Sequence, residues 1–480
     1  MTTIKYTLFL AGLLVLGSCT QDFEALNTNP NAPVRVEAEL LLRQVIYDYG
    51  DEMAYEGFVA GNLLGQYFTA IDFNLFDRHS LTEPQFGGNP WPTLYRNLRD
   101  NEILLAEARN NPAAAVYEGP ALILKAYLSA ALTDMYGDVP YREALRGGEG
   151  LVTAAYDSQE SIYTEPEGIL DNLEKGLAAI AAYEGTASLR GDILFGGDLR
   201  GWVRFAQSLR IKALLRLSDR IEVATPLQAI YESGDFIQTN ADNATFDFTD
   251  RQPNNFRMAN LRAGDFNLFI LSATTEDLLQ DLNDPRLSTF FRPTANDPTA
   301  FRGLLNGPDA SQTSISVADF SLTGRIFREA TGSLDANFMT AWETAFLLAE
   351  AAERGLLPAD AQAWYETGVE LAFAYWQTEL PADYLSTGPA AYGANGADPL
   401  EQILTQKWIA NLLNGYEGWI EYRRTGFPQL RTVAASLNDD RIPVRLPYPA
   451  DEEALNNANY LRATATNGNS VNAPVWWDVD

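Results

Sequence analysis

Apolar side chains recur at three- and four-residue intervals through several long stretches of this 480-residue sequence. This spacing places them on one face of an α-helix, whereas a half-buried strand would alternate every second residue. The clearest series are Leu124, Leu128, Ala131 and Met135, then Phe338, Trp342, Phe346 and Ala349, and then Tyr365, Val369, Ala372 and Trp376. The pattern predicts a mainly α-helical protein whose amphipathic helices share one core.

The predicted helices come in pairs. A helix over 338–355 ends at Gly355, and Pro358 opens the next helix, over 361–378. Together they predict an antiparallel hairpin about as long as a tetratricopeptide repeat. Three further hairpins are predicted in the same way, namely 37–50 with 53–68, 92–109 with 115–136, and 159–182 with 202–221. Because no linker-like tract divides the chain, we expect one domain over residues 37–480.

Between the helical pairs lie stretches rich in Gly, Pro, Asn and Asp, at 69–91, 240–335 and 437–480. They are too long to be simple connections, and loops of this length in a compact protein are usually functional. Short alternating runs such as Thr245 to Phe248 predict strands of small hairpins. We therefore expect a loop-rich face with minor β-hairpins on a helical body.

Residues 1–18 have the pattern of a secretory signal peptide. Lys5 supplies a positive charge, and Tyr6 to Leu16 is an apolar stretch too short to span a bilayer of roughly 30 Å as a helix. Gly17 and Ser18 then precede Cys19, which is the arrangement that a lipoprotein signal peptidase requires. An ordinary signal peptide or an N-terminal membrane helix with an incidental cysteine is the alternative.

Cys19 is the only cysteine in the chain, and its position directly after the small residues favours lipidation over chance. Asp22 and Glu24 follow closely, which resembles the acidic signal that sends some Gram-negative lipoproteins to the outer surface. We expect residues 19–36 to form a lipidated tether that anchors the protein to outer-membrane lipid on the cell surface.

Charge and residue usage exclude several classes of function. The chain has 34 Lys and Arg against 64 Asp and Glu, a formal net charge of −30, so it repels phosphodiesters and anionic lipids and a nucleic-acid partner is not expected. With one cysteine and one histidine, His79, it can form neither an internal disulfide nor a zinc site of His and Cys. No glycine loop has the spacing of a phosphate-binding motif, so no cofactor and no metal is expected.

Several sequence blocks, in order along the chain, carry a family resemblance. They are ALTDMYGDVPYREAL (131–145), GDILFGGDLRGWVRFAQSLRIKALLRLS (191–218), LNDPRL (282–287), FMTAWETAFLLAEAAERGLL (338–357), QILTQKWIANLLNGYEGWIEYRRTGFPQL (402–430), IPVRLPYPADEEALNNANY (442–460) and VWWD (475–478). With the segment around Cys19, these blocks resemble the SusD/RagB family of outer-membrane nutrient-binding lipoproteins. One departure is Gln207, where the family pattern leads us to expect Asn.

The resemblance implies about four tetratricopeptide-like helical pairs that carry an irregular, loop-rich face. It also implies a binding protein rather than an enzyme, one that sits at the extracellular mouth of a SusC-like TonB-dependent barrel transporter. Such a protein holds an oligosaccharide or another polymer fragment, in some relatives a peptide, and closes over it like a lid.

Candidate ligand contacts are the aromatic side chains in the long loops, because sugars present flat apolar faces edged with hydroxyls. Stacking on these faces requires exposed rings, with polar side chains at the rim. Individually, each ring is more often buried in a core than exposed to a ligand. The residues that we nominate are Phe73, Asn74, Phe76, His79 and Trp91 from the first loop, and Asn255, Phe256 and Phe266 from the second.

The adjacent arginines of GYEGWIEYRRTG (415–426) are predicted to be structural. Adjacent helical residues point about 100° apart, so Arg423 and Arg424 cannot form one clamp. Glu417 or Glu421 could pair with them instead. We expect this motif to define the fold rather than the ligand.

Two other functions stay open at this point. A surface glycosidase needs only two carboxylates and no histidine, and with 64 acidic residues such a pair can always be nominated. A helical-repeat scaffold that binds only proteins is the second.

The proposed lipid anchor gives a first testable prediction. Cells that produce the full-length protein in radiolabelled palmitate should label it, because the thiolate of Cys19 would carry the lipid and stable anchoring takes two or more acyl chains. The Cys19→Ser variant should stay unlabelled and leave the membrane fraction. Label on the variant, or none on the natural chain, would contradict the anchor.

Overall fold

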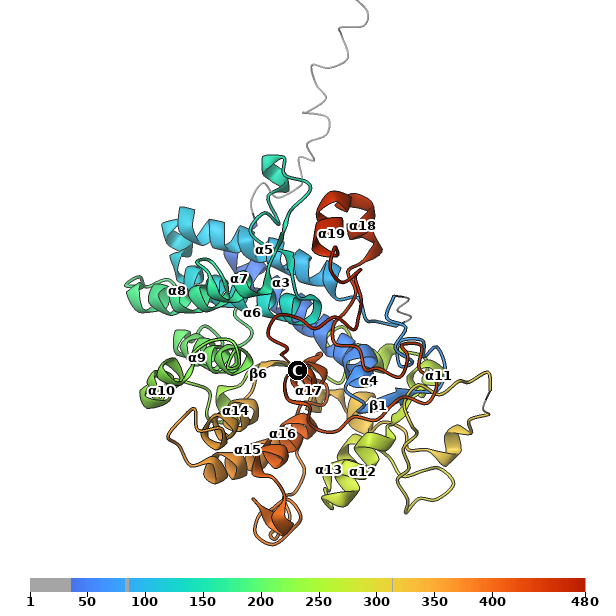
Figure 1. Cartoon of the computed structure of the whole chain (residues 1–480). Helices are drawn as coiled ribbons and strands as arrows, with labels where there is room; N and C mark the ends of the chain where they lie inside the picture. Colours follow the sequence, from blue (N-terminus) through green and yellow to red (C-terminus); the bar gives the residue numbers. More distant parts are fainter. Residues whose placement is uncertain (1–35, 83–85, 313, 480) are drawn as a thin grey trace, which may run out of the picture.

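The computed structural model describes residues 36–82, 86–312 and 314–479. The predicted signal peptide, Cys19 and nearly all of the tether lie outside these residues. Helices dominate the described part, and strands occur only as short two-stranded pairs. Figure 1 shows the helices packed side by side, with long irregular segments beside α11, α12 and α13. The prediction of a mainly α-helical, tetratricopeptide-like fold is confirmed.

The prediction of a hairpin from 37–50 and 53–68 is wrong. The chain continues as one rod through α3 (Ala38–Glu56), the π-helical turn η1 (Gly57–Gly61) and α4 (Asn62–Leu64). Gly50 makes room for a ring instead of ending a helix, because a Cβ there would lie 2.4 Å from the Phe246 ring. Gly61 likewise permits close approach of the Gly415 backbone, whose carbonyl oxygen would lie 2.0 Å from an added Cβ.

The next two predicted pairs are present. The predicted pair 92–109 and 115–136 corresponds to α5 (Trp91–Asn110) and α6 (Glu118–Tyr136), which Asn101 links by donating to the Ala121 carbonyl at 2.9 Å. The predicted helix 159–182 is divided into two at Pro166, which has no backbone N–H to donate. The two resulting helices are α7 (Gln159–Thr164) and α8 (Ile169–Ala182). The second of them, α8, packs against α9 (Leu199–Arg216).

The hairpin over 338–378 is confirmed; its first helix starts later than predicted, and both helices end earlier. It consists of α14 (Ala341–Glu353) and α15 (Ala361–Tyr375). Gly355 has φ of 70° just beyond the first helix, and the Asp360 side chain caps the second by accepting from the Ala363 N–H at 3.0 Å. The remaining long helices are α10 (Ala224–Ser233), α16 (Pro399–Ala410) and α17 (Glu417–Thr425).

The long loops contain short elements that pair across the chain. The predicted strand at 245–248 is β4 (Ala244–Asp247), but its partner is β6 (Asp335–Met339), far along the sequence. The other pairs are β1 (Phe68–Ala70) with β5 (Phe269–Leu271), and β2 (Val139–Pro140) with β3 (Tyr156–Asp157). Short helices are α11 (Ala263–Phe266), α12 (Ala273–Asp281), α13 (Arg286–Phe290), α18 (Ala450–Leu455) and α19 (Asn457–Ala463).

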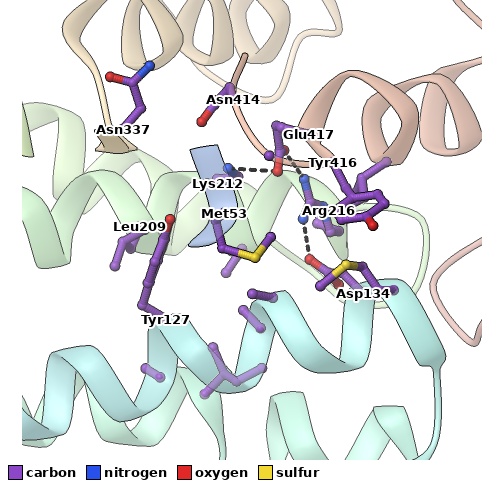
Figure 2. A pocket seen from close by; sticks show the side chains of 18 of the residues that line it. Met53, Tyr127, Asp134, Leu209, Lys212, Arg216, Asn337, Asn414, Tyr416 and Glu417 are labelled. Carbon is purple, nitrogen blue, oxygen red and sulfur yellow. Dashed lines mark hydrogen bonds and ion pairs between the residues drawn. The ribbon is translucent and has the colours of Figure 1, made fainter. Parts of the chain in front are cut away.

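A network of buried charges joins α6, α9, α14, α16 and α17, and Figure 2 shows the part formed by Asp134, Lys212, Arg216 and Glu417. Arg216 is at its centre, pairing with Asp134 and Glu417 and, at 2.8 Å, with Glu421. Each side chain is at most 14% exposed. We call this set the buried ion network; its members are Asp134, Lys212, Arg216, Glu343, Glu350, Lys407, Glu417, Glu421 and Arg424.

The two adjacent arginines point into different surroundings, as predicted. Arg424 pairs with Glu350 at 2.6 Å and with Glu421 at 2.7 Å. Arg423 instead donates to the backbone carbonyl oxygens of Asp134 and Val444, each at 2.6 Å. Burial alone would raise the pKa of the Glu421 carboxyl, but Arg424, Lys407 and Arg216 hold that pKa well below its usual value.

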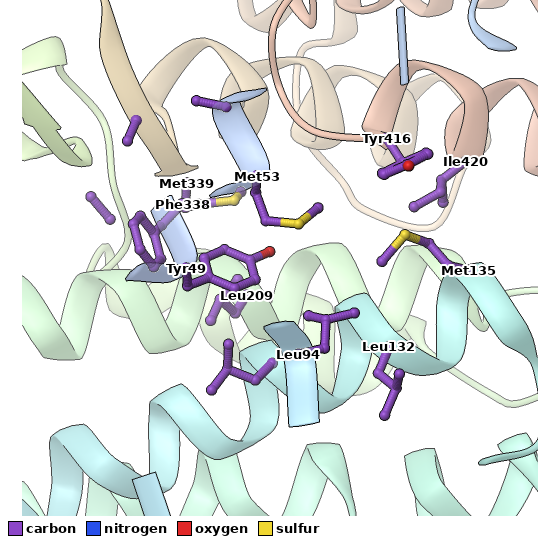
Figure 3. Close-up of a cluster of buried hydrophobic side chains, with 14 of the residues drawn as sticks. Tyr49, Met53, Leu94, Leu132, Met135, Leu209, Phe338, Met339, Tyr416 and Ile420 are labelled. Atoms are coloured by element: carbon purple, nitrogen blue, oxygen red, sulfur yellow. The ribbon is translucent and has the colours of Figure 1, made fainter. Parts of the chain in front are cut away.

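Apolar side chains pack next to the network (Figure 3). They come from helices and strands that are distant in sequence, so one core serves both the first and the last helices. The side chains labelled there include Tyr49, Met53, Leu94, Leu132, Met135, Leu209, Phe338, Tyr416 and Ile420.

The buried ion network predicts an asymmetry between two arginine substitutions. Arg216→Met leaves three buried carboxylates short of a partner and should lower the free energy of unfolding by about 3–5 kcal/mol. The matched control is Arg325→Met, which removes an exposed partner of Glu329 and should cost less than about 1 kcal/mol. Urea unfolding measures both, and equal losses would contradict the network's importance.

A second prediction concerns two carboxyls that face each other on β4 and β6. Asp247 and Asp335 are register partners, and burial together with Asp247 raises the pKa of Asp335 to about 7. The folded state therefore holds this proton more tightly than the unfolded chain. Protonation of Asp335 therefore stabilises the folded state, fully below about pH 4. This contribution is lost as the pH rises through 7, and the free energy of unfolding declines by about 2 kcal/mol after allowance for solvent screening.

Replacing Asp247 by Asn should flatten this part of the stability profile. Urea unfolding between pH 4 and pH 8 gives the profile, and Asp439→Asn, at a side chain that is 90% exposed, is the control. The interpretation fails if Asp247→Asn and the natural chain lose stability equally over this range.

Candidate functional site

The two loop segments nominated from the sequence meet in space. β1, at the start of the first loop, pairs antiparallel with β5, inside the second, and Phe68 is opposite Leu271. Just beyond the strand, the Ile71 N–H donates to the Leu268 carbonyl at 3.0 Å. Both segments therefore contribute to one face of the molecule, near β1 and α11 in Figure 1.

A cluster of phenylalanine rings underlies this face. The Phe58 ring centre lies 5.9 Å from both Phe256 and Phe266 and 5.4 Å from Phe269. Phe256 and Phe266 are 0% and 1% exposed. Their apolar surface is used by the core and is not available for stacking on a sugar in this structure.

Phe73 differs from every other aromatic side chain in the described residues, because it alone is classed as exposed, at 56%. Its ring meets Phe86 edge-on at 6.2 Å, and Phe86 in turn lies 5.7 Å from Phe269 in the core. The backbone of Phe73 has φ of 49°, a conformation that bulky side chains rarely adopt. Strain of this kind clusters at ligand-binding positions.

Buried polar side chains fix the loop that carries Phe73. The Asp77 carboxylate accepts hydrogen bonds from the Thr69 hydroxyl and the Asn306 amide, both at 2.7 Å, and from the N–H groups of Ala70 and Gly307. Burial raises the pKa of Asp77 to about 6, against the opposing effect of these four donors. The loop is held in one shape without regular secondary structure.

Asn74 and His79 also serve this loop. The Asn74 amide donates to the carbonyls of Ala70 and Pro308, at 3.0 and 2.6 Å. His79 is 4% exposed, and its Nδ1 lies 3.1 Å from the Arg441 carbonyl oxygen. Burial lowers the pKa of His79 to about 4, so the ring is neutral at pH 7 and donates from Nδ1.

The remaining nominated residues also lie in the interior. Trp91 is 7% exposed and packs against Tyr95 and Tyr136 at 4.9 Å each. Phe76 is 4% exposed. Asn255 is 6% exposed and exchanges hydrogen bonds with Asn260. Of the eight nominated residues we keep Phe73 for direct ligand contact, since the other seven are buried.

The surface around Phe73 combines aromatic rings with charged groups; we call it the Phe73 platform and define it as Phe73, Phe86, Asp72, Arg78 and Asp309. Arg78 and Asp309 are paired at 3.9 Å, and Asp72 is exposed. Aromatic rings can stack on the apolar face of a sugar while carboxylates and a guanidinium bond its hydroxyls. Phe86 lies in the first loop and met the same criterion as the nominated rings, but it was not nominated. Asp309 could not be found in this way, because it reaches this surface by pairing with Arg78 from a distant segment.

A cavity of about 80 Å³ lies at the centre of the molecule beside the buried ion network (Figure 2). Its lining includes Met53, Tyr127 and Leu209 next to Arg216 and Lys212. Ligand pockets usually begin at about 300 Å³, so this cavity suits a few water molecules rather than a sugar.

Within residues 36–82, 86–312 and 314–479, no helix has both the length and the apolarity needed to cross a bilayer. The same residues contain no group of three or more His, Cys, Asp or Glu side chains placed to hold a metal ion.

A protein-family model matches residues 30–449 of the chain. The family is SusD-like and is described as starch-binding and associating with the outer membrane. Because this match covers most of the sequence, the chain belongs to the SusD/RagB family. No match was found among curated protein sequences.

Solved structures confirm the fold. A chitin-binding protein is 25% identical, with a TM-score of 0.77 over 92% of this chain and 99% of its own. A SusD homologue from Bacteroides fragilis is 22% identical, with a TM-score of 0.79 over 92% and 100%. A chitin-binding SusD homologue from Flavobacterium johnsoniae is 22% identical, with a TM-score of 0.76 over 92% and 98%.

Proposed function

We propose that this protein is a cell-surface lipoprotein, anchored in the outer membrane through acylated Cys19. It binds an oligosaccharide and passes it to a SusC-like TonB-dependent barrel transporter. The family description as starch-binding and outer-membrane-associated supports the location and the ligand class. The chitin-binding protein that is 25% identical supports a glycan in particular.

The observation that carries the proposal is the exposed ring of Phe73, which stands on a strained backbone. Exposing a phenylalanine forfeits hydrophobic burial worth about 1.5–3 kcal/mol, and the left-handed backbone adds to this cost. The loop nevertheless holds the ring outward through the bonds to Asp77 and Asn74. A ligand that stacks on the ring would recover the lost burial.

Binding without cleavage is favoured by the state of the nearby groups. A glycosidase needs two carboxyl groups that both reach the glycosidic bond. The buried Asp77 carboxylate is occupied by four donors, and Asp72 accepts from the Phe73 N–H at 2.8 Å. His79 is buried and neutral, so it cannot act as a base at this surface.

The glycan is expected to be neutral. A chain with a net charge of −30 repels uronic acids and sulfated sugars at long range. Chitin oligosaccharides are the first ligands to test, because two matching structures are chitin-binding proteins. A peptide ligand is the alternative and belongs in the same panel.

The proposal predicts the effect of removing one ring. Isothermal titration with N-acetylglucosamine hexamer and with maltohexaose should give binding that Phe73→Ala weakens about tenfold, equivalent to roughly 1.4 kcal/mol. Phe73→Trp should preserve binding, because it keeps an aromatic face. Leu437→Ala, at a side chain that is 49% exposed and outside the platform, is the control.

The same samples test the chemistry. Incubation of the natural chain with each oligosaccharide should release no new reducing ends. Turnover would favour the hydrolase, and equal affinities of the natural chain and Phe73→Ala would rule out the platform.

A further inference from the structure

A groove of about 440 Å³ lies away from the Phe73 platform, between α5, α6 and the excursion that joins β2 to β3. In Figure 1, α5 and α6 lie well apart from β1. The volume is within the range of small-molecule pockets. The side chains that matter below are Tyr95, Glu102, Ile103, Lys125, Tyr141 and Leu145.

The groove has an exposed apolar part. Ile103 is 48% exposed on α5, and Leu145 is 39% exposed on the excursion. Leu145 also has φ of 67°, where a non-glycine residue is strained. Backbone strain of about 1–3 kcal/mol persists where the surroundings over-determine it, commonly at ligand sites. The strained leucine and the exposed isoleucine line the same groove.

The polar groups of the groove are already fixed in position. The Tyr95 hydroxyl donates to the Pro140 carbonyl at 2.7 Å, and the Tyr141 hydroxyl to the Glu167 carbonyl at 2.5 Å. Lys125 pairs with Glu102 at 2.6 Å. A ligand would therefore meet donors and acceptors that lose little freedom on binding.

The charges argue against an anionic ligand. Every cation that lines the groove has a carboxylate partner at 2.6–2.8 Å, so none is left to hold a phosphate or a sulfate alone. These pairs are Arg99 with Asp100, Lys125 with Glu102, Arg142 with Asp157, and Arg146 with Glu149.

A peptide added as a further strand is disfavoured as well. The strand that reaches the groove is β2, only Val139 and Pro140, and proline has no N–H to offer a new strand. Two tyrosines, apolar side chains and paired charges instead suit a neutral molecule with apolar faces and many hydroxyls.

We propose that this groove is a second oligosaccharide-binding site, independent of the Phe73 platform. The ligand class rests on the proposed function, while the location rests on the groove itself. Two sites on one chain would let a long glycan be held at two points, and the second binding event would then be intramolecular.

The test uses the full mature chain with N-acetylglucosamine hexamer and maltohexaose. Phe73→Ala weakens the first site about tenfold, and the residual binding is titrated with and without Leu145→Gly. Glycine relieves the strained φ, so this change should leave the melting temperature unchanged or higher while weakening residual binding about tenfold. Ile103→Asp should weaken it similarly, and Leu461→Asp, 56% exposed on α19 outside the groove, should not.

Hydrogen exchange locates the bound sugar. Added oligosaccharide should slow exchange in peptides covering 98–106 and 140–149 in the Phe73→Ala variant. If Phe73→Ala abolishes all binding, or if residual binding ignores both groove variants, the second site is overturned and the platform stands. If the groove variants alone abolish binding, the groove is the binding site and the platform fails. If the natural chain binds neither sugar, both the platform and the groove are overturned as binding sites.

Discussion

Nine buried charges meet where α6, α9, α14, α16 and α17 converge, and the rest of the molecule is arranged around them. Removing an ion from water costs several kcal/mol unless an opposite charge and further hydrogen bonds compensate it. Arg216, at the end of α9, satisfies this condition only when α6 presents Asp134 and α17 presents Glu417 and Glu421. Removal of one member is therefore far more costly than replacement of the whole network by apolar groups, because it leaves the other charges buried without a partner.

Secondary structure could be predicted from the sequence where contacts between neighbouring residues determine it. The hairpin of α14 and α15 follows from helical spacing, Gly355 and the cap at Asp360. Where a distant contact decides, the local signal misled. Gly50 resembles a helix end, yet it is glycine because the Phe246 ring occupies the space of its side chain. Likewise Arg424 had a local partner in Glu421, but the link from Arg216 to the distant helices α6 and α17 has no sequence signal.

The candidate site shows the same division. The two loops were nominated for their rings, and β1 and β5 do bring them together. A ring in a polar loop can be the apolar floor of that loop as easily as its outer face. Phe256 and Phe266 are buried beneath the loop and pack against Phe58, whereas the Phe73 side chain is exposed. What distinguishes them is the left-handed backbone at Phe73, which depends on the buried hydrogen bonds of Asn74 and Asp77 and could not be derived from the local sequence.

Rigidity and charge together limit what such a surface can bind. Because Asp77 and Asn74 already fix the Phe73 loop, a ligand need not pay for ordering it, and a shallow stacking contact can yield useful affinity. The surrounding negative charge works against anionic polymers at every approach, and the groove beside α5 has no unpaired cation to overcome it. A neutral, hydroxyl-rich ligand escapes this repulsion and also matches the rings and paired charges of both surfaces. Long-range repulsion therefore disfavours anionic ligands before any side chain makes contact. The rings and paired charges then bind the neutral ligands that reach the surface.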